Sequence, residues 1–249
     1  MRAAVGWPMW GLDDQEAMAM RVMVVGNSDG IGRALTQRLL ARGDEVVGIS
    51  RSPWPGEEAE AYTHFQLDVT ADDYVERLVD IVAQWGAPQV VVYCAGIGEL
   101  LVLEELAVQR RVFEVNLMGA VATLEVTLPP MLSAGQGHFV GLSSLADTGL
   151  SPQAPSYNAS KAAMSRYLES MALAVADKGV SITNVRFGFV DTKMAKSDVR
   201  PMMFTVEQAV DRLMKIIDAR RPPRRVTTPL PMAALVSLLS ALMWLKLMI

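Results

Sequence analysis

Short apolar runs alternate with longer stretches of helical periodicity along most of the chain. The β-branched run Arg21–Val25 stops at Gly26 and predicts a buried strand, and residues 31–42 show helical spacing that ends before Gly43. The same alternation predicts strands at 46–50, 64–67, 90–94, 138–142, 180–186 and 224–227, and helices at 72–84, 105–128, 156–178 and 206–219. Pro129 and Pro130 are expected to end the longest helix. The pattern predicts a single doubly wound, Rossmann-type α/β domain with a parallel sheet of about seven strands.

The two ends of the chain differ from this body, which we place at residues 21–230. Residues 1–20 form an N-terminal extension without the apolar core of a signal peptide, and Met18 or Met20 is an alternative start. Residues 231–249 are apolar except for two serines and Lys246, and as one helix they would be about 28 Å long, close to the ~30 Å of a bilayer core. This helix would dock on a membrane surface, span the membrane, or pack against the body or a second copy. The basic residues expected to meet anionic head groups are Arg220, Arg221, Arg224 and Arg225.

Composition excludes several other classes of protein. Apolar residues make up 51% of the chain and charged residues 20%, which argues against disorder, and a net charge of −4 gives no reason to expect nucleic-acid binding. Cys94 is the single cysteine, so no intrachain disulfide forms, and the two histidines have no clustered partners that would make a metal site. We expect a reducing, cytoplasmic location, peripheral to the membrane if the tail docks there.

A glycine-rich turn lies between the first predicted strand and helix. A turn of this kind lets the backbone approach a pyrophosphate, and the helix N-terminus supplies N–H groups and a positive dipole end. A glycine-rich turn without a ligand is the alternative, and the spacing departs from the GxGxxG fingerprint. The candidate phosphate-binding residues are Gly26, Ser28, Asp29, Gly30, Ile31 and Gly32.

The second predicted strand ends at Ser50 and is followed by Arg51. In a nucleotide-binding sheet this position faces the adenine ribose, where an acidic residue binds a 2′-hydroxyl and an arginine pairs with a 2′-phosphate. The sequence therefore favours NADP(H) over NAD(H). A solvated surface arginine is the alternative, and Asp29 argues mildly the other way because it brings negative charge near the phosphates.

Tyr157 and Lys161 share one face at the start of a long predicted helix. A free phenol has a pKa of about 10 and becomes a useful acid or base near neutral pH only if a cation stabilises the phenolate. Lys161 is placed to do so. Taken alone, the pair is also typical of an ordinary helix face.

Together these motifs resemble those of the short-chain dehydrogenase/reductase family, over about residues 21–192. The resemblance rests on the order and spacing of Gly26-xxx-Gly30-x-Gly32, Cys94-Ala95-Gly96, Asn116, Ser144 and Tyr157-xxx-Lys161. It implies that Tyr157 is the catalytic acid or base, and that Lys161 lowers the pKa of the tyrosine and binds the nicotinamide ribose. It further implies that Ser144 hydrogen-bonds the substrate oxygen and that Asn116 holds a water in a proton relay.

The resemblance also assigns cofactor contacts beyond the glycine turn. These are Asp68 and Val69 near the adenine, Ala95 and Gly96 after the fourth strand, and Gly188, Val190 and Thr192 on the nicotinamide side. The chain departs from the family pattern at Cys94, where the family has asparagine, and at Phe187, where it has proline. We interpret Cys94 as a buried structural thiol rather than a nucleophile.

The resulting interpretation is an enzyme that interconverts a carbonyl and an alcohol by hydride transfer, without a metal. A sensor or scaffold that binds NADP(H) without turnover is the main alternative, and a membrane-surface protein with weak residual activity is another. Methionines and Phe204 in a predicted substrate loop, residues 193–204, favour an apolar substrate. The helices predicted at 105–128 and 156–178 favour a homodimer or homotetramer.

Overall fold

The computed structural model describes residues 19–57, 59–194 and 202–248, and its centre is one parallel sheet. Seven strands follow the order β3-β2-β1-β4-β5-β6-β7, which confirms the predicted fold class. The strands are β1 (Arg21–Val25), β2 (Glu45–Ser50), β3 (Tyr62–Gln66), β4 (Val90–Tyr93), β5 (Gly137–Ser144), β6 (Val180–Phe187) and β7 (Arg225–Thr228). Strand order reverses between β1 and β4, where doubly wound sheets hold their ligands beyond the carboxyl ends of the strands.

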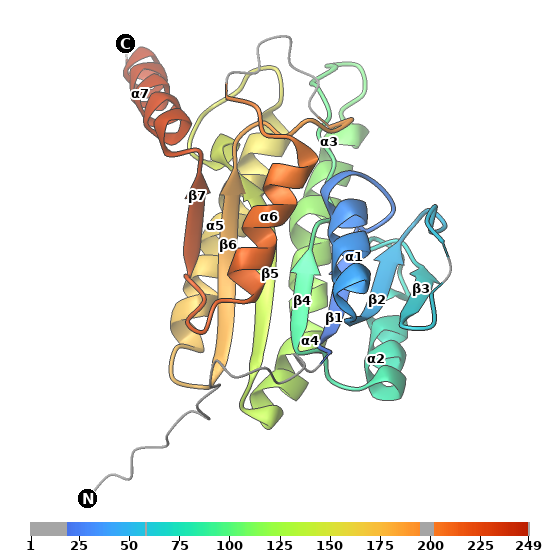
Figure 1. The fold of residues 1–249 in the computed structure, drawn as a ribbon. Coiled ribbons are helices and arrows are strands. Elements are labelled where there is room, and N and C mark those ends of the chain that lie inside the picture. Colours follow the sequence, from blue (N-terminus) through green and yellow to red (C-terminus); the bar gives the residue numbers. More distant parts are fainter. Residues whose placement is uncertain (1–18, 58, 195–201, 249) are drawn as a thin grey trace, which may run out of the picture.

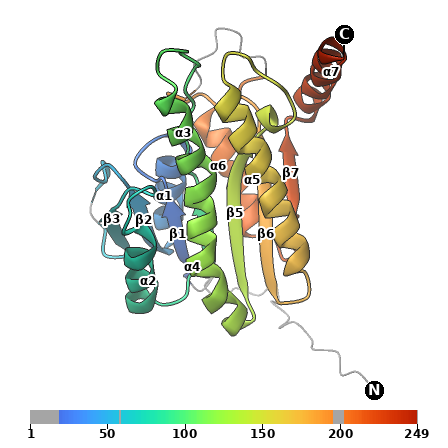
Figure 2. The same ribbon diagram turned by 180° about the vertical axis from the view of Figure 1, so that it is seen from behind.

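Helices cover both faces of this sheet (Figures 1 and 2). One face carries α1 (Gly30–Arg42) and α6 (Val206–Ile217). The other carries α2 (Tyr74–Trp85), α4 (Gly119–Ala134) and α5 (Pro155–Ala174), with α3 (Ala107–Phe113) leading through a π-helical turn, Glu114–Met118, into α4. The helices thus bury both sheet faces, as the near-continuous apolar strands require.

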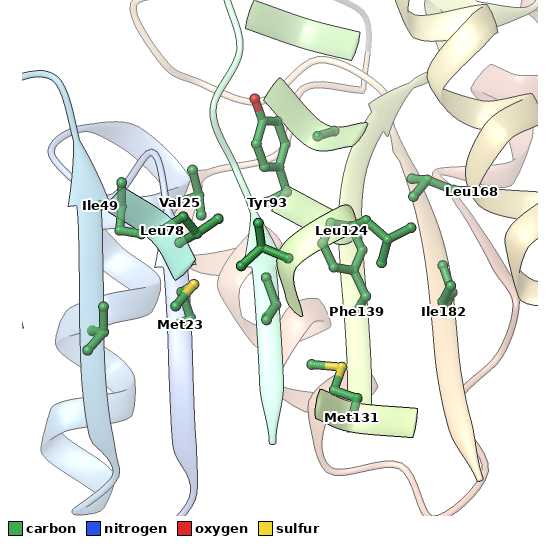
Figure 3. Packing of buried hydrophobic residues seen from close by; sticks show 14 of the residues in the cluster. Met23, Val25, Ile49, Leu78, Tyr93, Leu124, Met131, Phe139, Leu168 and Ile182 are labelled. Carbon is green, nitrogen blue, oxygen red and sulfur yellow. The ribbon is translucent and has the colours of Figure 1, made fainter. Parts of the chain in front are cut away.

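Alternate side chains of each central strand enter two separate cores. Met23 and Val25 of β1 point toward α2, α4 and α5, whereas Val22 and Val24 point toward α1 and α6. Figure 3 shows the first core, where Leu124 of α4 lies among side chains of the neighbouring strands. This period of two holds the strand register, since a one-residue slip would exchange the two faces.

The prediction that Pro129 and Pro130 end the long helix is wrong. The helix continues through both prolines to Ala134 and ends at Gly135, which has a left-handed φ of 63° and whose N–H reaches the carbonyls of Leu132 and Met131. Each proline removes one backbone donor. Met131, however, is fully buried beyond the prolines, and this packing overrides the local preference.

Two other helices end before their predicted limits. The helix predicted to reach residue 178 ends at Ala174, and the chain then turns through residues 175–179, where Gly179 has a φ of 77°. A Cβ at Gly179 would lie 2.0 Å from the carbonyl oxygen of Gly135, so the two turns meet at a contact that only glycine permits. The helix α6 ends at Ile217, two residues before its predicted end.

The C-terminal helix α7 (Leu230–Leu247) extends away from the body beyond the end of β7 (Figures 1 and 2). Among its described side chains only Met232 and Ser240 are buried, and Leu238 is 61% exposed. In the described ranges one helical stretch, Ala107–Ala134, is long and apolar enough to cross a membrane, but 44% of its most apolar window is buried inside the protein. It lies against the sheet and serves as a core helix. The apolar stretch of α7, Leu230–Met243, is shorter.

Candidate active site

The predicted site residues gather at the carboxyl edge of the sheet, around the reversal in strand order. The glycine turn follows β1, the Cys94–Gly96 turn follows β4, Ser144 ends β5, and Gly188 follows β6. Because all seven strands are parallel, these four segments meet at the same edge. The fold therefore brings together residues that are far apart in the sequence.

The glycines of the first turn are required by close backbone contacts. Gly26 has a φ of 86°, and a Cβ there would lie 2.4 Å from the backbone nitrogen of Ala95. A Cβ on Gly32 would lie 2.2 Å from the carbonyl oxygen of Gly26. Gly30 differs, since a Cβ there would meet only the Thr192 side chain, at 3.3 Å. Two glycines thus shape the turn, while Gly30 lies against the side chain of Thr192.

Asp29 caps the helix that follows this turn. Its carboxylate accepts a hydrogen bond from the Gly30 N–H at 2.8 Å and lies 2.8 Å from the Lys193 ammonium. The hydrogen bond from Lys193, and next that from Gly30, lower the pKa of Asp29. Lys193 therefore balances the negative charge that Asp29 brings to the glycine turn. Lys193 lies in the predicted substrate loop, of which residues 195–201 fall outside the described part of the chain.

The end of β2 presents an exposed arginine beside a buried serine. Ser50 donates a hydrogen bond to the Ser52 carbonyl at 2.7 Å, and the Arg51 carbonyl accepts one from the Gln66 amide at 3.0 Å. These bonds fix the backbone while the Arg51 side chain stays exposed. A guanidinium in this position is free to meet an anionic ligand.

Asp68 and Val69 are held by the neighbouring helices. Burial opposes ionisation of Asp68, but hydrogen bonds from Thr70 and the charges of Arg111 and Arg51 lower its pKa below the ordinary value. The Arg111 guanidinium lies 2.8 Å from the carboxylate. Val69 packs so closely on Gly119 that a Cβ there would lie 2.9 Å from it. The pair thus forms a fixed wall beside the ends of β1 and β4.

The four predicted catalytic residues converge from three elements. Ser144 ends β5, Tyr157 and Lys161 lie in α5, and Asn116 lies in the π-helical turn before α4. The Lys161 ammonium donates to the Leu142 carbonyl at 2.8 Å and lies 6.0 Å from the centre of the Tyr157 ring. Lys161 is buried and Tyr157 is half-buried, so the two groups lie at a protected edge of the sheet.

Asn116 is fully buried and joins two parts of the site. Its amide oxygen accepts from the Ile97 N–H at 2.8 Å, and its amide nitrogen donates to the Ile97 carbonyl at 2.9 Å and to Ser160 Oγ at 3.0 Å. Ser160 in turn donates to the Tyr157 carbonyl at 2.9 Å. Ser160 was not among the predicted site residues, although it directly precedes Lys161. Asn116 thus ties the turn after β4 to the helix that carries Tyr157.

Burial governs the ionisation of these groups. It raises the pKa of Tyr157 above the ordinary value, against the opposing effect of a hydrogen bond with Ser144. It also lowers the pKa of Lys161 to about 8. The resemblance implied that Lys161 lowers the pKa of Tyr157, but the ammonium points to the Leu142 carbonyl and the pKa of the phenol stays high. The phenol is accordingly in its proton-bearing form near neutral pH.

Similarity to known proteins shows the family of the chain. The short chain dehydrogenase family model matches residues 20–202. The chain belongs to the short-chain dehydrogenase/reductase family. An uncharacterized oxidoreductase of Myxococcus xanthus is 36% identical over 74% of this chain and 78% of its own length. A cis-4-hydroxycyclohexanecarboxylate dehydrogenase of Sinomonas cyclohexanicum is 34% identical over 80% of this chain and 86% of its own.

The fold of solved family members is the same. A short-chain dehydrogenase from Burkholderia cenocepacia, solved in complex with NADP, superposes with a TM-score of 0.75 at 24% identity, covering 88% of this chain and 92% of that one. This short-chain dehydrogenase/reductase is thus an NAD(P)-dependent oxidoreductase that acts on CH–OH or C=O groups. Within the described ranges no group of three or more His, Cys, Asp or Glu residues is arranged to hold a metal ion.

The two departures from the family pattern have local explanations. Cys94 is half-buried rather than buried as predicted, and desolvation raises the pKa of its thiol to about 12, so the thiol carries its proton near neutral pH. Phe187 is buried and meets Phe204 edge-on, with ring centres 6.5 Å apart. A Cβ on Gly188 would lie 2.7 Å from the sulfur of Met232, so the chain after β6 is held against the start of α7.

Proposed function

We propose that this enzyme is an NADP(H)-dependent carbonyl reductase or alcohol dehydrogenase for an apolar substrate. The observation that carries the proposal is the convergence of Ser144, Tyr157, Lys161 and Asn116 at the carboxyl edge of the sheet, where the glycine turn also lies. Bound there, the nicotinamide would supply or accept the hydride. Ser144 would donate a hydrogen bond to the substrate oxygen, and Tyr157 would give that oxygen its proton. Lys161 and Asn116 would hold the ribose and the water that returns a proton to the tyrosine.

The residues of the glycine turn fit a dinucleotide. The turn leads directly into the N-terminus of α1, where backbone N–H groups and the helix dipole favour a pyrophosphate. We assign this contact to Gly26, Ser28, Asp29, Gly30, Ile31 and Gly32. We assign the adenosine side to Ser50, Arg51, Asp68 and Val69, and the nicotinamide side to Ala95, Gly96, Gly188, Val190 and Thr192.

Preference for NADP(H) rests on Arg51. Structures of similar fold carry either cofactor, since one is described with NADP bound and another with NADH. Their identities to this chain are 22% and 17%, so they do not decide between the two. The exposed guanidinium directly after β2 is the local feature that favours a 2′-phosphate.

An apolar substrate is supported by the side chains around the entrance. Met194 lies beside Tyr157, because a Cβ on Gly98 would lie 3.5 Å from both side chains. The segments that follow β4, β5 and β6 expose further large apolar residues: Leu100, Val102, Leu103, Leu106, Leu150, Met202 and Met203. We expect NADPH oxidation to increase with the apolar size of the carbonyl in a panel of ketones and aldehydes. A sensor or scaffold would bind NADPH but consume none with any member of the panel.

We further propose a cytoplasmic enzyme that docks on membrane surfaces through α7. The helix is apolar on all sides yet largely exposed, and it follows β7 at the same carboxyl edge of the sheet as the apolar entrance segments. Arg220, Arg221 and Arg224 precede β7, whereas α7 follows it, and Arg225 lies 2.8 Å from Glu169. The strand β7 therefore separates these arginines from α7, and the proposed contact with the membrane rests on the apolar side chains of the helix.

Docking is tested with exposed leucines of α7. The double substitution Leu238→Glu and Leu242→Glu should reduce sedimentation with liposomes at least about tenfold, because burying a leucine contributes about 1.5–3 kcal/mol. The control is Val79→Glu, an exposed apolar position on α2, which should sediment like the unaltered protein. If the unaltered protein stays in the supernatant, α7 instead packs against another protein surface.

We also propose a two-fold symmetric homodimer or homotetramer built on α4 and α5. Their outer faces expose Leu132 and Leu173, which a second copy would cover. Light scattering at micromolar concentration should give two or four times the 27.1 kDa of the chain. A monomeric mass would contradict this assembly.

A further inference from the structure

A buried ion pair lies behind the proposed catalytic residues. Arg186 of β6 and Asp147 have side chains that are 9% and 4% exposed. The Arg186 Nε donates to Asp147 Oδ2 at 2.6 Å, and its Nη2 donates to Asp147 Oδ1, so the contact is bidentate. None of the family motifs in the sequence contains either residue.

Asp147 is rigidly connected to Ser144. The two residues bound a 3-10 turn, Leu145–Asp147, in which Ser144 is the N-cap and its Oγ accepts from the Ala146 N–H at 3.1 Å. A shift of the Asp147 carboxylate would therefore move the backbone of the turn and the serine hydroxyl with it. The ion pair fixes this turn to the neighbouring strand β6.

Asp147 also contacts the helix that carries Tyr157 and Lys161. Ser165 donates to Asp147 Oδ2 at 2.5 Å, and Ser143 Oγ lies 2.6 Å from Ser165 Oγ. Ser165 is one helical turn beyond Lys161 and two beyond Tyr157, so these residues share a face of α5. Asp147 thus joins the turn of Ser144 to the helix of Tyr157.

Positioning accounts for this pair better than stability does. Removing two charges from water is costly, and a buried ion pair replaced by apolar residues of similar volume is often no less stable. Four of the five N–H groups of the Arg186 guanidinium are hydrogen-bonded, since Arg186 also donates to Thr148 Oγ1 at 2.6 Å and to Thr227 Oγ1 at 3.3 Å. Buried hydrogen-bond networks of this kind fix one arrangement of the side chains.

We propose that Asp147 and Arg186 are positioning residues that set the distance between the Ser144 hydroxyl and the Tyr157 phenol. This inference rests on the proposed function, because both groups must reach one substrate oxygen at the same time. A misplacement of about 1 Å is enough to reduce the rate about a hundredfold. The pair itself touches neither substrate nor cofactor in this scheme.

Two variants test the positioning role of the Asp147–Arg186 pair, which we call the clamp. Arg186→Lys keeps the charge but loses the bidentate contact, and Asp147→Leu with Arg186→Met removes both charges. A cavity of about 310 Å³, lined in part by Asp147, Ser165 and Arg186, leaves room for the apolar side chains. We expect kcat to fall about ten- to a hundredfold in both variants, with an unchanged Kd for NADPH and cooperative thermal unfolding. Arg42→Lys is the matched control, because Arg42 forms a similar pair with Asp44 at the far end of α1 and should keep its kcat.

The outcomes separate the clamp from the function on which it rests. If the unaltered enzyme turns over no carbonyl, or Tyr157→Phe leaves its rate unchanged, the proposed function fails and the clamp fails with it. If those results hold but a folded Arg186→Lys or double variant keeps its kcat, only the clamp is overturned. If neither variant unfolds cooperatively, the pair is a stability element and the clamp is likewise overturned.

Discussion

Tyr157→Phe should remove nearly all carbonyl reduction while leaving the fold and NADPH binding unchanged. The ring remains in place in α5, and only the hydroxyl that would give the proton is lost. Positioned general acids contribute about 10²- to 10⁴-fold to the rate. We expect kcat, measured by NADPH oxidation with a saturating carbonyl, to fall at least about a hundredfold.

A control removes the hydroxyl of a different tyrosine, one that lies outside the proposed active site. Tyr74 is buried in the core, where its hydroxyl lies 2.7 Å from Thr123 Oγ1, and Tyr74→Phe should keep its kcat while losing some stability. If Tyr157→Phe keeps more than about a tenth of kcat, its barrier rises by less than about 1.4 kcal/mol. The role given to Tyr157 would then be wrong.

The ionisation of Tyr157 suits this role in the direction of reduction. Because burial raises the pKa of the phenol, it carries its proton near neutral pH and can act as an acid without prior protonation. Oxidation of an alcohol needs the phenolate instead, and the raised pKa moves that form to higher pH. Lys161, whose pKa burial lowers to about 8, is correspondingly easier to deprotonate within the relay.

Features that depend on local pattern could be predicted from the sequence. The central strands are continuous apolar runs because both of their faces are buried, and the alternation of these runs with helical stretches was enough to predict the parallel sheet. Ser144 and Tyr157 could be assigned from the sequence because their order and spacing, together with Lys161, resemble the pattern of the family.

Features that depend on tertiary packing could not be predicted in this way. The helix through Pro129 and Pro130 is held by the burial of Met131, which the local propensity of proline does not reveal. Arg186 and Asp147 are 39 positions apart, and nothing in their neighbourhoods announces a pair. In the sequence, Asp29 is an isolated negative charge in the glycine turn, and only the fold brings the Lys193 ammonium beside it.

The choice between the two cofactors depends on a single exposed side chain. A charge-assisted contact between Arg51 and a 2′-phosphate would contribute about 1.5–3 kcal/mol, or about 10- to 100-fold in affinity. Asp68 does not provide the opposite preference, because its carboxylate is already engaged by Arg111 and Thr70. An aspartate at position 51 would repel the phosphate and accept a hydrogen bond from a free 2′-hydroxyl.

Arg51→Asp should therefore reverse a preference for NADPH into one for NADH. In the unaltered enzyme we expect NADPH to bind about 10- to 100-fold more tightly, measured as Kd for both cofactors by fluorescence titration at fixed salt. Arg212→Asp makes the same change of charge at an exposed position of α6 and should leave the ratio of the two Kd values as it was. A shift in that control would assign the effect to net charge rather than to a local contact. Equal Kd values in the unaltered enzyme would contradict the role of Arg51, because a guanidinium that meets the phosphate must favour the cofactor that carries it.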